Sequence, residues 1–411
     1  MSEYIYLRPK YVGEFQCDGR ICPASCCSRH WRILIDNETY KKYSEFEIDG
    51  QKITKYLEKN PGGEDFLIVQ NENDCCPFLN DEGLCKIQLK YGAENLSQTC
   101  WSYPRQLFNF YEVIEISLTP TCPLALDLIL NSERIKFETC PVKLPEWMHG
   151  QIIVSENFVP EEFFLHIIDL QLTAISILQE RRLTIDQRLV ILGFYLYQVE
   201  QIYTSKNLNA LATLNKLYTS EEFFTEQMPM LLDSVKFQFV EFAELMFGLL
   251  GKIYGDEKIL KTETNEKYIE LLEKTFDIKF SDADDFNFME LAEKYYALDE
   301  IREIFIKKYS VEFENFLVND FFGKLYPFKF VGTIQQNYAV FVMLFKIVEI
   351  ISLAIVANSR EDENKTRAEI FKMIGDISMD LNHNENYISA IAESIKEKSD
   401  ITILMRALLD A

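Results

Sequence analysis

All ten cysteines of this chain lie in the first third of the sequence, and this clustering constrains the fold more than any other feature. The first is Cys17 and the last is Cys140, while the chain continues to residue 411. Random placement would give such a distribution roughly 2 times in 100,000. The N-terminal third is therefore expected to use its sulfur atoms for a shared purpose.

The spacing of the cysteines favours metal or iron–sulfur ligation. Cys17, Cys22, Cys26 and Cys27 are separated by four, three and no residues, so their thiolates can meet at one centre while the bound metal holds the loop together. A second group has wider spacing and needs the fold to bring it together. It consists of Cys75, Cys76, Cys85 and Cys100, with Cys122 following a β-like run at 113–118.

Other uses of the cysteines are less well supported by the pattern. A radical S-adenosylmethionine loop needs Cys-x3-Cys-x2-Cys, but Arg29 stands where the third cysteine would be, and the paired Cys-x2-Cys knuckles of zinc fingers are absent. Buried thiols and reactive redox thiols remain alternatives for the group. Cys75 and Cys140 are each as compatible with a small buried hydrophobic residue as with a ligand. His30 could ligate a metal or donate to a cluster, or it could be a surface histidine.

Composition limits the partners and the compartment. The formal charge of −23 would repel a phosphate backbone, so we expect no nucleic-acid partner. The first residues lack the features of a secretory signal, which predicts a cytoplasmic protein in which a disulfide framework is disfavoured. The most apolar stretch, 339–357, contains Lys346 and Glu349 and therefore predicts a buried helix and no membrane span.

The turn and helix patterns predict an α+β chain with two parts. Residues 1–150 are rich in turn signals, with β-like runs at 32–35 and 66–69, and are expected to form an irregular Cys-rich domain organised by metal. Residues 151–411 are expected to form a mostly α-helical domain that docks on it. The helices are predicted at 160–172, 188–203, 220–254, 264–276, 286–309, 311–322, 331–357, 367–381 and 386–409.

Recognisable catalytic and cofactor motifs are missing. The sequence contains no Gly-x-Gly pair, Gly-x-Ser-x-Gly elbow or P-loop, so no residue can be assigned to a nucleotide cofactor or a catalytic base from a motif. The many Phe and Tyr residues of the helical part fit core packing, with an aromatic-lined groove for a cofactor or peptide as the alternative.

Several motifs together resemble the flagellin lysine-N-methylases and, more loosely, zinc- or iron-chelating cysteine-cluster domains. The residues that carry the resemblance are Cys17-Asp18-Gly19-Arg20-Ile21-Cys22-Pro23-Ala24-Ser25-Cys26-Cys27, His30-Trp31, Cys76-Pro77-Phe78-Leu79-Asn80, Gly83-Leu84-Cys85, Cys100, Tyr103-Pro104-Arg105, Glu314-Asn315-Phe316-Leu317-Val318-Asn319-Asp320-Phe321-Phe322 and Pro327-Phe328. The resemblance thus covers most of the chain.

The resemblance implies transfer of methyl groups from S-adenosylmethionine to lysine amines of flagellin, with an iron–sulfur cluster, of the 4Fe–4S type, or zinc held by cysteines. The implied metal ligands are Cys17, Cys22, Cys26, Cys27, Cys76, Cys85, Cys100 and Cys122. Eight thiolates could serve two four-ligand centres or one centre with spares. The alternative function is a non-catalytic adaptor or chaperone, with structural zinc and a helical domain that binds a protein partner.

Overall fold

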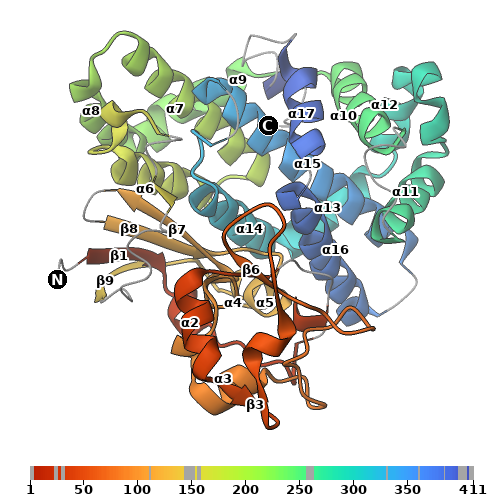
Figure 1. Ribbon diagram of the computed structural model, residues 1–411. Helices are drawn as coiled ribbons and strands as arrows, with labels where there is room; N and C mark the ends of the chain where they lie inside the picture. Colours follow the sequence, from red (N-terminus) through yellow and green to blue (C-terminus); the bar gives the residue numbers. More distant parts are fainter. Residues whose placement is uncertain are drawn as a thin grey trace.

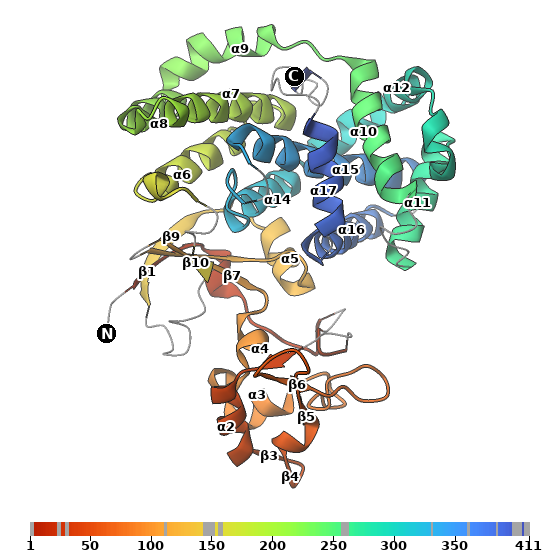
Figure 2. The same cartoon turned by 45° about the horizontal axis from the view of Figure 1, so that its top comes forward.

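The computed structural model describes residues 4–22, 26–28, 33–110, 113–142, 153–154, 159–255, 263–329, 332–359, 362–383, 385–396 and 405–406. Within these residues the chain is mostly helical, with strands confined to the N-terminal part, which is an α+β layout (Figure 1). The view in Figure 2 shows a small cysteine-bearing part below, a sheet in the middle and the helices above.

A five-stranded sheet forms the middle of the molecule. Its strand order is β10-β7-β8-β1-β9, with β1 parallel to β8 and antiparallel to β9. β7 and β8 form an antiparallel hairpin, and β10 pairs with β7 in parallel. The strands are β1 (Tyr4–Pro9), β7 (Arg105–Phe110), β8 (Val113–Leu118), β9 (Phe137–Val142) and β10 (Ile153–Val154).

Residues 26–28 and 33–102, which lie between β1 and β7 in the sequence, form a separate small unit. We call it the cysteine unit. Nine of its buried residues make a hydrophobic cluster of their own, distinct from the core of the remaining chain. Its elements are β2 (Leu34–Ile35), α2 (Asn37–Glu45), β3 (Glu47–Ile48), β4 (Gln51–Lys52), β5 (Leu57–Lys59), β6 (Phe66–Ile68), α3 (Lys86–Tyr91) and α4 (Gln98–Ser102).

The sheet and the helices share one continuous hydrophobic cluster, which we call the main core. The bounds are α1 (Tyr11–Glu14), α5 (Pro123–Leu130), α6 (Ile167–Leu178), α7 (Ile185–Thr204), α8 (Leu211–Tyr218), α9 (Met228–Ser234), α10 (Phe239–Gly255), α11 (Glu263–Phe276), α12 (Phe288–Tyr296), α13 (Asp299–Lys308), α14 (Ser310–Gly323), α15 (Ile334–Asn358), α16 (Glu363–His383) and α17 (Glu385–Lys396). Helix formation therefore depends on burial against the sheet as well as against other helices.

Helix α14 joins the sheet to the helices, and it carries the motif 314–322. Its Glu314 is 1% exposed and accepts hydrogen bonds from Arg181 and from Arg188, whose Nη1 lies 2.8 Å from Oε2. Asn319 of the same helix accepts a hydrogen bond from the hydroxyl of Tyr11 next to β1. The polar residues of this motif therefore have a structural role at the joint.

The predicted buried helix is confirmed as α15. It is long and apolar enough to cross a membrane by composition, but 94% of its most apolar window is buried inside the protein. Its Lys346 Nζ lies 2.8 Å from Asp186 of α7 and 2.6 Å from Glu349. Lys346 thus forms ion pairs with both Glu349 and Asp186 within the core.

Several predicted elements differ from the observed ones. The single helix expected at 220–254 is divided into a π-helical turn at Phe223–Gln227, α9 and α10. Pro229, which lacks an amide hydrogen, lies in the first turn of α9 and accounts for the change at the π-helical turn. The chain leaves the helical conformation between α9 and α10, at 235–238. The helix expected at 286–309 is divided between α12 and α13, since Asp299 and Glu300 favour a new helix start. The strands at 34–35, 66–68 and 113–118 were predicted, whereas β1, β7 and β9 were not. The domain boundary near residue 150 stays a prediction.

Candidate metal centre

The core of the cysteine unit gathers four of the predicted ligands. Cys76 is one of its buried residues, and Cys27, Cys85 and Cys100 pack against that cluster. The amide of Cys76 donates to the carbonyl of Cys27 over 2.8 Å, which fixes the two segments to each other. Cys26 lies beside Cys27 and its thiol is in side-chain hydrogen-bond range of it.

A tight turn positions Cys85. The side-chain oxygen of Asn80 accepts hydrogen bonds from the backbone amides of Glu82 and Leu84. The backbone amide of Asn80 donates to the carbonyl of Leu84. The turn ends in a bridge between Leu79 and Cys85. The side chain of Asn80 therefore sets the loop that carries this thiol, as Asn commonly does in turns.

Two glycines bring the segment with Cys17 and Cys22 onto this turn. A Cβ atom on Gly19 would lie 1.7 Å from the carbonyl oxygen of Gly83, and Gly83 has a φ of +77°. No side chain can be accommodated at Gly19 unless the two backbones separate. The Cys17–Cys22 segment is thus held directly against the loop that ends at Cys85.

Two further thiols lie near the N-terminal ends of helices α4 and α5. Ser97 is 1% exposed and caps α4, with its Oγ accepting from the amide of Cys100 over 3.3 Å. Cys122 precedes Pro123 at the start of α5 and belongs to the main core. The cysteines therefore lie on both sides of the junction between the cysteine unit and the sheet.

Neighbouring cysteines contribute to the raised pKa values of several of these thiols. Desolvation raises the pKa of Cys17 to about 11, and the largest contribution from another thiol comes from Cys122, followed by Cys27, Cys22 and Cys85. Burial also raises the pKa of Cys100 to about 12, with smaller contributions from Cys27, Cys85 and Cys17. At both positions the contributions from other thiols come from predicted ligands.

Burial and neighbouring thiols dominate at the remaining positions. The pKa of Cys26 is raised, first by its hydrogen bond with Cys27 and then by burial. Burial raises the pKa of Cys76, Cys85 and Cys122, and Cys22 adds to the effect at Cys122. Without a cation these groups are neutral thiols.

The donor set fits a soft metal by its chemistry. A cation beside these thiols would offset the repulsion between thiolates and release their protons. Within the residues that the structure describes, however, no three Cys, His, Asp or Glu side chains already converge in a geometry that could hold a metal ion. The ligand assignment therefore stays a prediction, and His30 lies outside the described residues.

Cys75 and Cys140, which are outside the predicted ligand set, have contacts of their own. The Cys75 thiol is 3.4 Å from the carbonyl oxygen of Asn73. Cys140 is on β9 and packs against the main core. The sequence did not indicate Gly19, Gly83 or Ser97 as positioning residues, although the two glycines lie inside the motifs of the resemblance.

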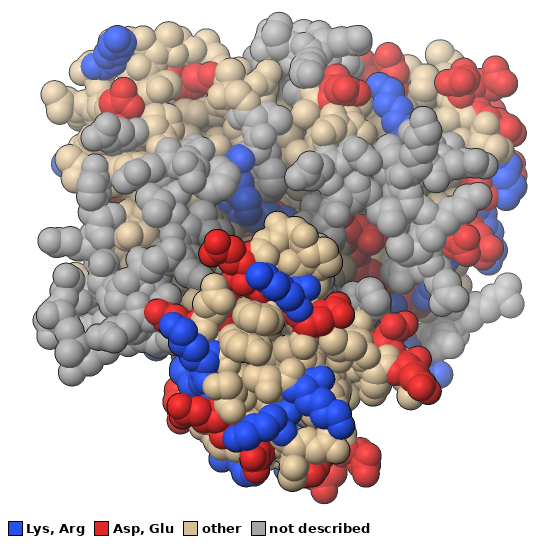
Figure 3. Space-filling model, viewed as in Figure 1, with Lys and Arg blue, Asp and Glu red and all other residues tan. Residues whose placement is uncertain are grey.

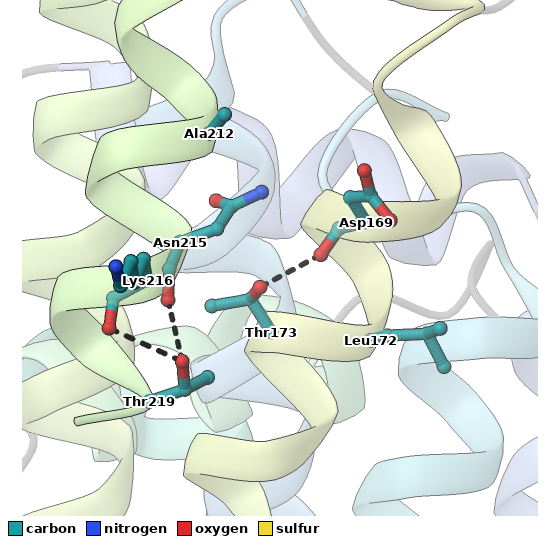
Figure 4. A pocket seen from close by; sticks show the side chains of 7 residues that line it. All are labelled: Asp169, Leu172, Thr173, Ala212, Asn215, Lys216 and Thr219. Carbon is teal, nitrogen blue, oxygen red and sulfur yellow. Dashed lines mark hydrogen bonds between the residues drawn. The ribbon is translucent and has the colours of Figure 1, made fainter. Parts of the chain in front are cut away.

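A hollow between α6 and α8 is a separate feature, shown in Figure 4, with a volume of about 410 Å³. It is lined by Asp169, Leu172, Thr173, Ala212, Asn215, Lys216 and Thr219. The hydroxyl of Thr173 donates to the carbonyl of Asp169 over 2.7 Å, and that of Thr219 donates to the carbonyl of Asn215 over 2.9 Å. No cysteine lines this hollow, so it is not part of the metal neighbourhood.

Charges of both signs alternate on the face of the cysteine unit seen in Figure 3. Lys86 Nζ lies 2.7 Å from Asp49, and Lys52 Nζ lies 3.2 Å from Glu47. Within each pair the positive and the negative charge offset each other.

Comparison with known proteins agrees with the resemblance read from the motifs. The family model described as the FliB lysine N-methylase C-terminal domain matches residues 171–409. Flagellar biosynthetic protein FliU of Salmonella muenchen is 32% identical over 136 residues, which cover 32% of this chain and 80% of that protein.

Two further relatives carry the name lysine-N-methylase, one from Salmonella typhimurium and one from Salmonella choleraesuis. Each is 32% identical over 136 residues, covering 32% of this chain and 34% of the relative. The match thus spans about a third of the length of these relatives. No solved structure matches this chain. Since the matching family model covers more than half of the sequence, the chain belongs to the FliB lysine N-methylase family.

Proposed function

We propose that this protein transfers methyl groups from S-adenosylmethionine to lysine side chains of flagellin. The observation that carries the proposal is the family match over 171–409, supported by the names of the relatives. The cytoplasm is the compartment that fits the proposal, because its reducing conditions keep the ten cysteines available as thiols.

The second part of the proposal is a metal centre, an iron–sulfur cluster or zinc, at the junction of the cysteine unit and the sheet. Its ligands would come from Cys17, Cys22, Cys26, Cys27, Cys76, Cys85, Cys100 and Cys122. Such a centre would supply folding energy to the cysteine unit. The support is the gathering of these thiols by the Gly19–Gly83 approach, the Asn80 turn and the Ser97 cap.

The reaction sets a requirement on the protein. The electron pair of a neutral lysine Nζ forms the new C–N bond, the sulfur of the donor keeps the pair of the broken C–S bond, and the nitrogen loses a proton to a base. An enzyme contributes by aligning the amine and accepting the proton. The catalytic base and the donor site are not assigned to residues of this chain.

The experiment begins with anaerobic purification and measurement of iron, zinc and acid-labile sulfide per chain. The metal-loaded protein is then incubated with S-adenosylmethionine and flagellin, and the flagellin mass is measured. We expect mass increases of whole methyl groups that disappear when the donor is omitted. Unchanged flagellin, together with no binding of S-adenosylmethionine, would reject the methylase and favour the structural-zinc adaptor.

A pair of glycine variants tests the metal centre without touching a thiol. Gly19→Ala forces the Cys17–Cys22 segment away from Gly83, whereas Gly62→Ala places its Cβ in open space. We expect Gly19→Ala to lose metal and Gly62→Ala to retain it. Equal metal content in both variants would separate the metal site from this loop contact.

A further inference from the structure

Arg105 lies at the junction between the cysteine unit and the sheet, on the first residue of β7. Its guanidinium carbon is 5.4 Å from the ring centre of Phe15 and 5.2 Å from that of Trp101. Nη1 donates to the carbonyl of Trp101 over 3.0 Å. Two rings and one carbonyl therefore fix the position of this cation.

The two rings belong to segments that carry predicted ligands. Phe15 is two residues before Cys17, and Trp101 directly follows Cys100. These segments are far apart in the sequence, and Arg105 contacts both. The arginine thus connects the cysteine segment that follows α1 to the ligand-bearing helix α4.

The charge of Arg105 has no carboxylate partner within ion-pair distance among the described residues, unlike Arg8 on β1, whose Nη2 lies 2.9 Å from Glu138. Burial lowers the pKa of Arg105, while Cys17 and, to a smaller extent, Tyr6 act in the opposite direction. A half-buried cation without an anion is costly, and an anion placed beside it would remove that cost.

We propose that Arg105 is a positioning residue of the metal centre, holding the Cys17 and Cys100 segments together and supplying a positive charge on the side of Cys17. A centre ligated by several thiolates carries negative charge, which a fixed guanidinium stabilises. The inference rests on the metal centre proposed above. It does not depend on the methyl-transfer reaction.

The test is the zinc affinity of the full chain, measured by competition with a chromophoric chelator under reducing conditions. Arg105→Gln removes the charge, Arg105→Lys keeps it without the planar fork, and Arg8→Gln on strand β1 of the same sheet is the control. We expect Arg105→Gln to weaken zinc binding about 10- to 100-fold, as loss of a group supporting metal ligands does. Arg105→Lys should fall between Arg105→Gln and the parent, and Arg8→Gln should match the parent.

The outcomes are distinguishable. If the parent protein binds neither zinc nor iron, the metal centre itself is rejected and this inference falls with it. If the parent binds zinc and a folded Arg105→Gln binds it equally well, only the role of Arg105 is rejected. Equal weakening in the Lys and Gln variants would reject the contribution of charge. Unchanged zinc affinity with reduced binding of S-adenosylmethionine would instead assign Arg105 to an anionic ligand and overturn the proposal.

Discussion

The cysteine unit and the main core are built from the same chain but are stabilised by different means. The cysteine unit buries nine residues in its own cluster, and one of these is a cysteine. The main core extends through the sheet and helices α5 to α17 and encloses ion pairs such as Arg188–Glu314. A small unit with few buried residues needs an additional constraint, whereas a large apolar core can stand alone and can even hold buried charges.

Metal removal should have the largest effect and should act on one region only. We expect a chelator under reducing conditions to abolish hydrogen-exchange protection in the cysteine unit while α7 and α15 stay protected. Structural zinc contributes about 10 to 16 kcal/mol to zinc-finger peptides.

Single thiol replacements provide a matched pair for the same comparison. Cys85→Ser should reproduce the loss of protection in the cysteine unit, whereas Cys75→Ser, outside the proposed ligand set, should not. If the chelator exposed both regions together, the two would not be independently stabilised.

Removing one buried charge should lower the free energy of unfolding of the main core. Glu314 and Arg188 are 1% and 6% exposed at their side chains, with 2.8 Å between Oε2 and Nη1. Glu314→Gln leaves Arg188 buried without its partner, and we expect a loss of about 3 to 5 kcal/mol in the free energy of unfolding of the main core. Denaturant unfolding followed by tryptophan fluorescence and circular dichroism measures this loss.

The control for this prediction is Glu303→Gln, an exposed glutamate on the neighbouring helix α13. It should change the unfolding free energy by less than about 0.5 kcal/mol. An equal effect of the two variants would mean that Glu314 and its arginines do not stabilise the joint.

The sheet face of the main core contains a carboxyl group whose ionisation opposes folding. Glu115 on β8 is 1% exposed, and burial raises its pKa to about 8, with Gln171 of α6 acting in the opposite direction. The pKa in the unfolded chain is about 4.3. Its stabilising contribution is therefore fully present below that value and is lost as the pH rises towards the folded pKa.

Glu115→Gln removes this titration. Between pH 5 and pH 7 the variant should gain stability relative to the parent by about 1.4 kcal/mol per pH unit, in denaturant unfolding at each pH. Glu138→Gln on β9, a carboxylate that pairs with Arg8 in a more exposed position, is the control and should show no such gain. A pH-independent difference for Glu115→Gln would show that this carboxyl group is ionised in the core.

The sequence predicted those parts of the fold that depend on nearby residues. The apolar spacing of α15 and the alternation of β8 are local patterns, and both elements were predicted. β1 was not predicted, because its strand structure depends on pairing with β8 and β9 more than a hundred residues away. Local pattern is a weaker guide wherever a distant partner decides the structure.

The same limit applies to the candidate site. The cysteine motifs indicated which thiols to consider, and four of them lie in or pack against the core of the cysteine unit. The approach of Gly19 to Gly83 and the contacts of Arg105 join segments that are distant in the sequence. Spacing alone could not show that Cys122 of the main core contributes to the raised pKa of Cys17.

The smallest predicted effect tests whether surface charge contributes to the difference between the two regions. In the cysteine unit Lys52 Nζ lies 3.2 Å from Glu47 Oε1, and on α12 Lys294 Nζ lies 2.7 Å from Glu290 Oε1. Exposed pairs of this kind contribute about 0.3 to 0.5 kcal/mol, less in high salt. Glu47→Gln and Glu290→Gln should therefore each lower the stability of their own region by this small amount, measured by hydrogen exchange with and without added salt. A much larger, salt-sensitive loss for Glu47→Gln would mean that ion pairs hold the cysteine unit together, and the need for a metal there would disappear.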